Sequence, residues 1–318
     1  MGYEAWIHTG IMLSAAIIGL CLGVFTSFGD FSSDLIEPAL MLMLFLVFLS
    51  IDLTKVKDSF KNIRFLSSAV TINFIITPIV AFILGLLFFN GSVDLRIGLI
   101  MLLVTPCTDW YLVFTSVSKG NVDLSSTLLP INLILQIVLL PIYLLIFMGQ
   151  SVEFDIAGML ADMVFILIIP FTAALILKLL ATKIDIAVRF KDKLNDNCDN
   201  LQLFFLCIAI LCMFASESKT LFDNIDTMIE MIIPLLIFFI LVYTLSSLVS
   251  RQLRYSYDDT TSLIFTTMAR NSPLALAIAV AVFPENPLIS LVLVIGPLIE
   301  LPVLSITANM RLNRRPEA

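Results

Sequence analysis

Charged residues are scarce in this chain. Asp, Glu, Lys and Arg make up only 14% of its 318 residues, whereas 59% of the residues are hydrophobic. A soluble domain of this size needs much more polar surface to cover its core. The composition therefore predicts an all-α polytopic membrane protein, and the lipid bilayer is its first expected partner.

Histidine and the common catalytic motifs are also missing. The single histidine is His8, and neither an HExxH nor a GxSxG sequence occurs. These motifs carry the zinc site of many metalloproteases and the nucleophile of many serine hydrolases. The five cysteines include no CxxC pair, so a disulfide framework is not expected. We predict that the protein is not an enzyme, uses no cofactor and no resident metal, and binds no nucleic acid.

Long apolar runs fill most of the chain, and a membrane-spanning helix needs about 20 such residues. The predicted spans cover residues 10–28, 35–51, 64–89, 95–118, 124–148, 156–181, 199–215, 227–250, 258–283 and 287–310. The loops between them are short, and the longest polar stretch lies around residues 183–197. We therefore expect ten transmembrane helices in one integral domain that covers residues 1–318.

The basic residues predict the orientation of these helices. With the N-terminus inside, the inner loops and the C-terminal tail hold 15 of the 18 Lys and Arg residues, and the outer loops hold only Arg96 and Lys219. This bias places both termini in the cytoplasm of a cell that carries the protein in its plasma membrane. Ten helices divide into two five-helix repeats, about 10–148 and 156–310. An odd number of helices per repeat makes the two repeats inverted, as in many secondary transporters.

Two of the predicted spans are interrupted by helix breakers. The fourth contains Thr-Pro-Cys-Thr-Asp-Trp at residues 105–110, and the ninth contains Ala-Arg-Asn-Ser-Pro at residues 269–273. Pro106 and Pro273 each lack a backbone donor and clash with the preceding turn. Broken helices at membrane depth are tolerated where they are buried in protein or line a cavity. Their corresponding positions in the two halves predict a transporter's binding site.

Three charged residues lie near these breaks or deep in a span. Asp109 and Arg270 would neutralise each other if the two breaks cross; alternatively, Arg270 attracts an anion or takes the place of a coupling cation. Glu300 has no basic residue near it in the sequence. A low dielectric favours the neutral form of its carboxyl group, which suits a proton carrier. A structural acid bonded to hydroxyl groups is the alternative. Asp109 is the second candidate for proton coupling.

Uncharged polar residues complete the candidate site. Cys107 follows the first break, where its thiolate would bind a soft ligand, although a cysteine in a membrane helix is also a common apolar filler. Asn132 and Gln136 lie one turn apart on one face of the fifth helix, where hydrogen bonds between helices are the alternative role. The predicted substrate-binding residues are Cys107, Thr108, Asn132, Gln136, Asn271 and Ser272.

At these residues the sequence resembles the arsenite permeases of the bile acid/arsenite/riboflavin transporter superfamily. The resemblance is carried by Cys107 in the fourth helix, by residues 132–139 (NLILQIVL) in the fifth, by residues 274–283 (LALAIAVAVF) in the ninth and by residues 296–304 (GPLIELPVL) in the tenth. It implies a ten-helix fold with a panel and a core domain, and crossed helices four and nine. It also implies export of arsenite, or of the similar antimonite, in exchange for protons. The family's required cysteine and glutamate fall on Cys107 and Glu300.

The chain departs from the family at several of these positions. Pro106 stands where the permeases often carry arginine before the cysteine. In the related sodium/bile acid symporters, the ninth helix carries a Glu and a Gln that bind sodium; Thr266 and Arg270 stand there in this chain. A fixed positive charge repels sodium, so we expect no sodium coupling. The alternative substrate to a small inorganic metalloid is a small organic anion held by Arg270.

Overall fold

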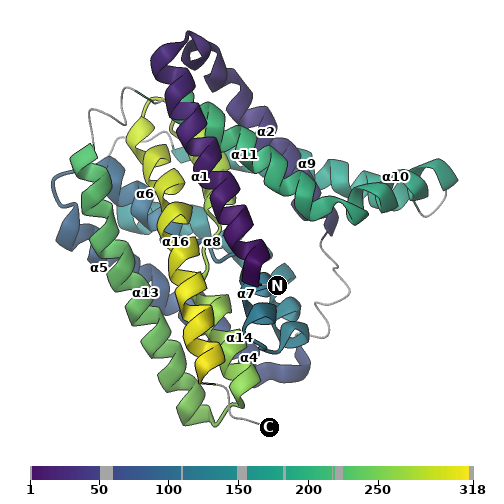
Figure 1. Ribbon diagram of the computed structural model, residues 1–318, viewed down its shortest axis with the longest axis vertical. Coiled ribbons are helices and arrows are strands. Elements are labelled where there is room, and N and C mark those ends of the chain that lie inside the picture. Colours follow the sequence, from purple (N-terminus) through teal and green to yellow (C-terminus); the bar gives the residue numbers. More distant parts are fainter. Residues whose placement is uncertain are drawn as a thin grey trace.

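A computed structural model describes residues 2–50, 60–108, 110–148, 156–181, 184–216, 218 and 225–314. Within these ranges the chain is helical and contains no strand, as predicted (Figure 1). The helices are α1 (Gly2–Phe25), α2 (Phe28–Ser50), α4 (Ile63–Thr71), α5 (Thr77–Phe88), α6 (Val93–Val104), α7 (Trp110–Val117), α8 (Val122–Met148), α9 (Ile156–Leu180), α10 (Asp185–Asp196), α11 (Cys198–Ser216), α13 (Ile225–Leu253), α14 (Tyr257–Met268), α15 (Ser272–Val282) and α16 (Pro287–Asn313). The 3₁₀ turn η1 (Phe60–Asn62) and the π-helical turn η2 (Ile72–Ile76) flank α4.

The apolar character of these helices fits a membrane protein. Among the described residues, four helical stretches are long and apolar enough to cross a bilayer: 63–88, 122–147, 229–253 and 287–313. Shorter apolar helices cover 14–25, 168–180 and 200–216. Large hydrophobic side chains such as Phe25 and Leu87 are exposed on the outside of the molecule, as lipid-facing residues are. The membrane class is confirmed, and the number of ten spans stays a prediction.

Two spans are each divided into a pair of short helices, as the sequence indicates. The predicted helix over 95–118 consists of α6 and α7, and the one over 258–283 consists of α14 and α15. Pro106 lies inside the first interruption, whereas Pro273 belongs to the first turn of α15. Proline is well tolerated in a first turn because the missing N–H has no helical partner there. The second interruption therefore covers the residues just before this proline.

The helices form two groups around the breaks. In one group α11 packs against α1 and α2, and α2 packs against α9; in the other, α6 packs against α5 and α16, and α13 packs against α14. Glycines allow two of these approaches. Gly19 of α1 faces the backbone of α11 at Leu211, and a Cβ at Gly98 of α6 would lie 2.8 Å from Val292 Cβ of α16. Small residues at such contacts let transmembrane helices approach closely.

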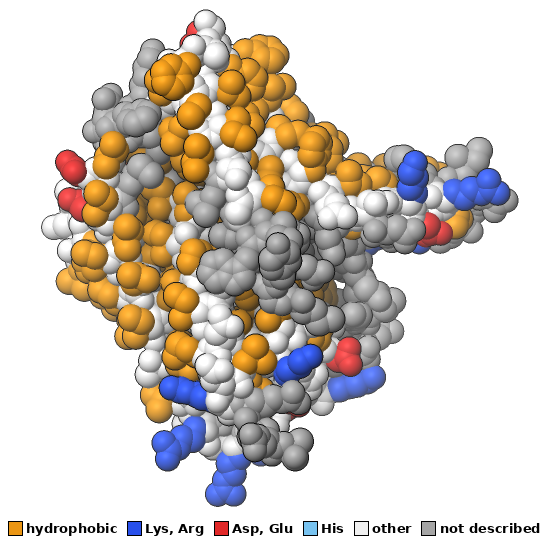
Figure 2. Space-filling model, viewed as in Figure 1, with side chains coloured by type: hydrophobic (Ala, Val, Ile, Leu, Met, Phe, Trp, Pro, Cys, Tyr) orange, Lys and Arg blue, Asp and Glu red, His pale blue; other side chains and the backbone are white. Residues whose placement is uncertain are grey.

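The polar stretch at residues 183–197 differs from the predicted loop because it contains the helix α10. In the sequence, Ile186, Phe190 and Leu194 recur every four residues between charged ones, a spacing that favours an amphipathic helix. That pattern is typical of helices that lie in the membrane interface. In Figure 1, α10 extends away from the other helices. Figure 2 shows Lys and Arg side chains on this extension and at the end of the molecule where α13 ends.

Candidate functional site

The two interrupted segments are paired with each other through their backbones. The Cys107 N–H donates to Ala269 O at 3.0 Å, and the Asn271 N–H donates to Thr105 O at 2.7 Å. These bonds form a short antiparallel bridge centred on Pro106 and Arg270. Each segment thereby satisfies backbone groups that its broken helix leaves without a partner. Such pairing is what makes an interrupted helix stable at membrane depth.

Polar side chains stabilise the helix ends next to this bridge. Asn271 caps α15, because its Oδ1 accepts a hydrogen bond from the Leu274 N–H at 3.2 Å. Its Nδ2 donates to Thr108 Oγ1 at 3.3 Å, which joins the second break to the first. On the other side, Thr105 Oγ1 donates to Met101 O at 2.9 Å at the end of α6. The structure therefore places Thr108 and Asn271, two of the predicted site residues, in contact with each other.

Arg270 lies in the bridge with its side chain almost fully buried at 2% exposure. Its guanidinium Nη1 donates to Leu103 O at 2.8 Å and its Nε donates to Met268 O at 3.2 Å. Nη2 donates to Asn73 Oδ1 at 3.1 Å and also to Thr267 O. The centroid of the Phe238 ring lies 5.2 Å from the guanidinium carbon of Arg270. Protein oxygens therefore engage all three guanidinium nitrogens.

Glu300 of α16 lies against the same bridge. Its Oε1 accepts a hydrogen bond from the Arg270 backbone N–H at 2.8 Å, and its side chain is only 3% exposed. The sequence places no basic residue near Glu300, yet the fold brings it to a residue thirty positions away. The contact is to the backbone rather than to the guanidinium, so the carboxyl group holds the second break in position directly.

Cys107 is buried at the backbone bridge, two positions after Thr105 and directly after Pro106. It is therefore the cysteine that lies in the paired segment itself, whereas Cys207 and Cys212 belong to α11. Cys212 is buried in the apolar core, as expected of a packing residue. Of the described residues, no three His, Cys, Asp or Glu side chains cluster closely enough to hold a metal ion.

Asn132 and Gln136 are fully buried on α8, which packs against α6, α7 and α14. Among the described residues, neither amide has a hydrogen-bond partner for its oxygen or its nitrogen. The hydroxyl groups of Thr266 and Ser272 at the second break are also buried and unpaired within the described chain. Buried polar groups are nearly always hydrogen-bonded, and an unpaired one costs about 1–3 kcal/mol. These unpaired groups are therefore candidates for contact with a polar ligand.

Asp109 lies outside the described residues, so its predicted pairing with Arg270 and its predicted role in proton coupling remain predictions. Asn73 is the site residue that sequence reasoning missed. It lies in the π-helical turn η2, and its Nδ2 donates to Thr266 O at 3.2 Å while its Oδ1 accepts from Arg270. A single amide in a long apolar run was the available signal. Single π-helical turns inside α-helices are frequent at functional sites.

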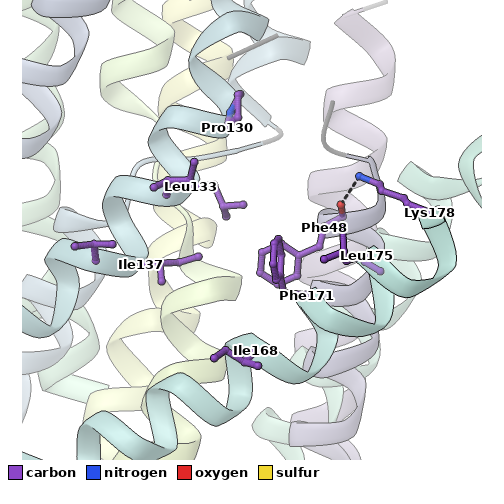
Figure 3. Close-up of a pocket in the computed structure, with 11 residues that line it drawn as sticks. Phe48, Pro130, Leu133, Ile137, Ile168, Phe171, Leu175 and Lys178 are labelled. Carbon is purple, nitrogen blue, oxygen red and sulfur yellow. Dashed lines mark hydrogen bonds between the residues drawn. The ribbon is translucent and has the colours of Figure 1, made fainter. Parts of the chain in front are cut away.

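An apolar cavity of about 360 Å³ lies between α8 on one side and α2 and α9 on the other (Figure 3). Leu133 and Ile137 of α8 face it, and so do Phe48 and Phe171 from the opposite side. At its edge, Lys178 Nζ donates to Phe48 O at 3.0 Å. The α8 residues that line the cavity are Pro130, Leu133, Ile134, Ile137 and Val138, and the buried amides of Asn132 and Gln136 are not part of this lining.

Comparison with known proteins gives consistent matches. The sequence profile of the Sodium Bile acid symporter family matches residues 37–224, more than half of the chain. The chain is 24% identical over 279 residues to the arsenical-resistance protein Acr3 of Corynebacterium glutamicum, which covers 85% of this chain and 75% of that protein. It is 21% identical over 276 residues to Acr3 of Alkaliphilus metalliredigens, covering 83% and 77%. It is also 25% identical over 241 residues to the uncharacterized protein YbaS of Bacillus subtilis, covering 76% of each.

Proposed function

The chain belongs to the Sodium Bile acid symporter family, and we propose that it is a secondary transporter that exports arsenite in exchange for protons. One observation carries this proposal. The two interrupted segments are joined by backbone hydrogen bonds at Pro106 and Arg270, and this bridge brings the buried Cys107 and the carboxyl group of Glu300 to one crossing. Two relatives that align with most of the chain are arsenical-resistance proteins, which supports the choice of substrate.

The substrate contacts follow from the chemistry of arsenous acid, a small neutral molecule with three hydroxyl groups on a soft centre. A thiol is the preferred ligand of such a centre. The sulfur of Cys107 displaces one hydroxyl group of arsenic, and the thiol proton leaves with that hydroxyl group as water. Attack by water at arsenic reverses this step and releases the substrate. The unpaired amides of Asn132 and Gln136 supply donors and acceptors for the remaining hydroxyl groups.

Thr108, Asn271 and Ser272 contribute to the same site from the two breaks. Asn271 and Thr108 are hydrogen-bonded to each other. Asn271 directly precedes α15, and Thr108 lies two residues before the start of α7. The start of a helix carries exposed N–H groups and a partial positive charge, which suits oxygen atoms of a ligand. We propose that the hydroxyl group of Ser272, unpaired in the described chain, is completed by the bound substrate.

Glu300 is the proposed proton carrier. In its ionised form it accepts the Arg270 N–H and so holds the second break. Protonation weakens this hydrogen bond, because a charged acceptor binds more strongly than a neutral one. Protonation of Glu300 is thereby linked to the geometry of the second break. An exchanger needs such a link, because its site must hold either the proton or the substrate at one time.

The proposed topology has ten spans in two inverted repeats, about residues 10–148 and 156–310, with both termini in the cytoplasm and the protein in the plasma membrane. The strong bias of Lys and Arg toward one set of loops supports it. The exposed Arg251, Arg254 and Arg314 lie at the ends of α13 and α16, which this topology places on the cytoplasmic side. Both repeats are expected to belong to one integral domain that covers residues 1–318.

The alternative, a small organic anion anchored by Arg270, is not favoured. A carboxylate anchor needs a free guanidinium edge, and the Arg270 donors are directed at four protein oxygens. The deciding experiment is uptake of arsenite into everted membrane vesicles with the pH gradient and sodium varied independently. Uptake that follows the pH gradient supports the proposal. Uptake of an organic anion with no arsenite uptake would refute it.

A further inference from the structure

A groove with apolar walls lies between α13 and α16, two helices that pack side by side (Figure 1). Its volume is about 230 Å³. The walls consist of Leu236, Phe239, Ile240 and Tyr243 from α13 and of Val303, Ile306, Thr307 and Met310 from α16. Both sets have the spacing i, i+3, i+4, i+7, which places side chains on one face of a helix. The groove is therefore formed by one face of each helix.

The groove opens outward and spans the depth of one membrane leaflet. Ile240 on one wall is 65% exposed and Ile306 on the other is 57% exposed. Both helices belong to stretches that are long and apolar enough to cross a bilayer, so their exposed side faces lipid. Residues 236 to 243 cover about 10 Å at 1.5 Å per residue, which is about two-thirds of the hydrocarbon thickness of one leaflet. This depth suits an acyl chain of that leaflet.

One end of the groove is polar and positively charged. Tyr243 lines the groove, and Arg314 Nη1 donates to its Oη at 3.3 Å. Arg314 is exposed at the end of α16, and Figure 2 shows Lys and Arg side chains at this end of the molecule. A guanidinium binds phosphate oxygens through paired N–H donors. The Tyr243 hydroxyl accepts from Arg314, so it keeps a hydrogen that it can donate to the same phosphate.

The bottom of the groove reaches the second break. Met268, the last residue of α14, lines the groove with a buried side chain. Its backbone oxygen accepts from Arg270 Nε at 3.2 Å. A methionine side chain adapts to irregular apolar neighbours. A hydrocarbon chain in the groove therefore packs against α13, α14 and α16 together, and its binding stabilises these three helices relative to one another.

We propose that the groove between α13 and α16 binds one acyl chain of an anionic phospholipid, and that Arg314 and Tyr243 hold its phosphate group. The leaflet is the one at the C-terminal ends of both helices, which is cytoplasmic in the proposed topology. An amphiphile matches the site because the walls are apolar and the positive charge lies at one end. An apolar partner helix would fill the walls without supplying an anion at this end, and a free phosphate would leave the walls uncovered. The proposal does not depend on the identity of the transported substrate.

Native mass spectrometry of the purified full-length protein tests this site. Delipidated protein in detergent is mixed with phosphatidylglycerol or with phosphatidylcholine of the same acyl chains, at equal mole fraction. The wild type should retain phosphatidylglycerol about fivefold more tightly, which is the gain that one basic residue at the membrane surface gives an anionic lipid. Arg314→Gln should remove this preference. Arg314 is exposed at a helix end, so the variant should fold as the wild type does.

Two further variants separate the groove from the general charge of this surface. Arg251→Gln removes the same charge near the end of α13, eight residues beyond Tyr243, and should keep the lipid preference. Val303→Phe fills the groove and should weaken retention of both lipids. Phosphatidylglycerol should also raise the unfolding temperature of the wild type saturably, and that of Val303→Phe much less. Equal retention of the two lipids by the wild type, an equal loss in both arginine variants, or full retention by Val303→Phe would each overturn the proposal.

Discussion

Replacing Glu300 by glutamine separates the proposed proton carrier from its structural contact. Glu300 Oε1 accepts the Arg270 N–H at 2.8 Å in a site that is only 3% exposed. Glutamine keeps a carbonyl oxygen at the same reach and loses the titratable proton. Hydrogen bonds to charged groups contribute about 1.5–3 kcal/mol and neutral ones about 0.5–1.5 kcal/mol. Glu300→Gln should therefore lose about 1–1.5 kcal/mol at the break and remain folded.

The assay is arsenite transport by protein reconstituted in liposomes. Under an imposed pH gradient, Glu300→Gln should lose net efflux, since it cannot release a proton. Without a gradient it should still exchange labelled for unlabelled arsenite, because the substrate contacts remain. Glu300→Asp keeps a titratable group at a shorter reach and should retain part of the pH-driven flux.

Undiminished pH-driven efflux by Glu300→Gln would refute the assignment and make Asp109 the remaining candidate carrier. Glu300→Ala is the structural control. It removes the acceptor and leaves the buried Arg270 N–H without this partner, which costs about 1–3 kcal/mol. Both net efflux and exchange should then fall together, and the contrast with glutamine separates the two roles.

Further predictions concern the thiol, the amides, the coupling ion and the topology. Cys107→Ser should abolish arsenite flux and spare folding, whereas Cys212→Ser should be nearly silent; full activity of the first would remove the thiol mechanism. Gln136→Leu removes a buried amide without a described partner, so the unfolding temperature should hold or rise while the apparent affinity for arsenite falls about tenfold. Unchanged affinity would make the amide structural. Replacing sodium by potassium at fixed pH should leave the flux of the wild type unchanged. Reporter fusions after Lys61 should report cytoplasm and fusions after Asn90 the outside; a reversed pair would contradict the inverted repeats.

The breaks were predictable because they interrupt apolar runs with residues that such runs rarely contain. Pro106 and Pro273 mark the two interruptions, and the structure divides both helices close to them. The family could be recognised from the sequence as well, because its motifs lie in the two interrupted helices and in the predicted fifth and tenth helices. The number of spans and their repeat organisation rest on the sequence pattern and stay predictions.

The surroundings of Arg270 were not predictable in the same way. Leu103 and Thr267 contribute backbone oxygens, and every residue has one, so their identity carries no signal. Asn73 contributes an amide from a turn that widens locally, and its partner lies 197 positions away. The sequence indicated a buried acid at Glu300, and the structure buries it, but its contact with the Arg270 backbone depends on how α16 packs. Long-range geometry of this kind follows from tertiary structure alone.

The crossing is held by bonds between main-chain atoms, and this has a consequence for how the protein can change over generations. Cys107 and Asn271 contribute their N–H groups to the bridge, and Thr105 and Ala269 contribute their carbonyl groups. Any amino acid other than proline supplies both groups, so these two hydrogen bonds do not themselves depend on which side chains stand at the four positions. The proposed thiol ligand Cys107 can therefore be exchanged for another small side chain without loss of its backbone hydrogen bond to Ala269. Descendants of one such sequence can acquire a different cargo through a few point mutations, without passing through an unfolded ancestor.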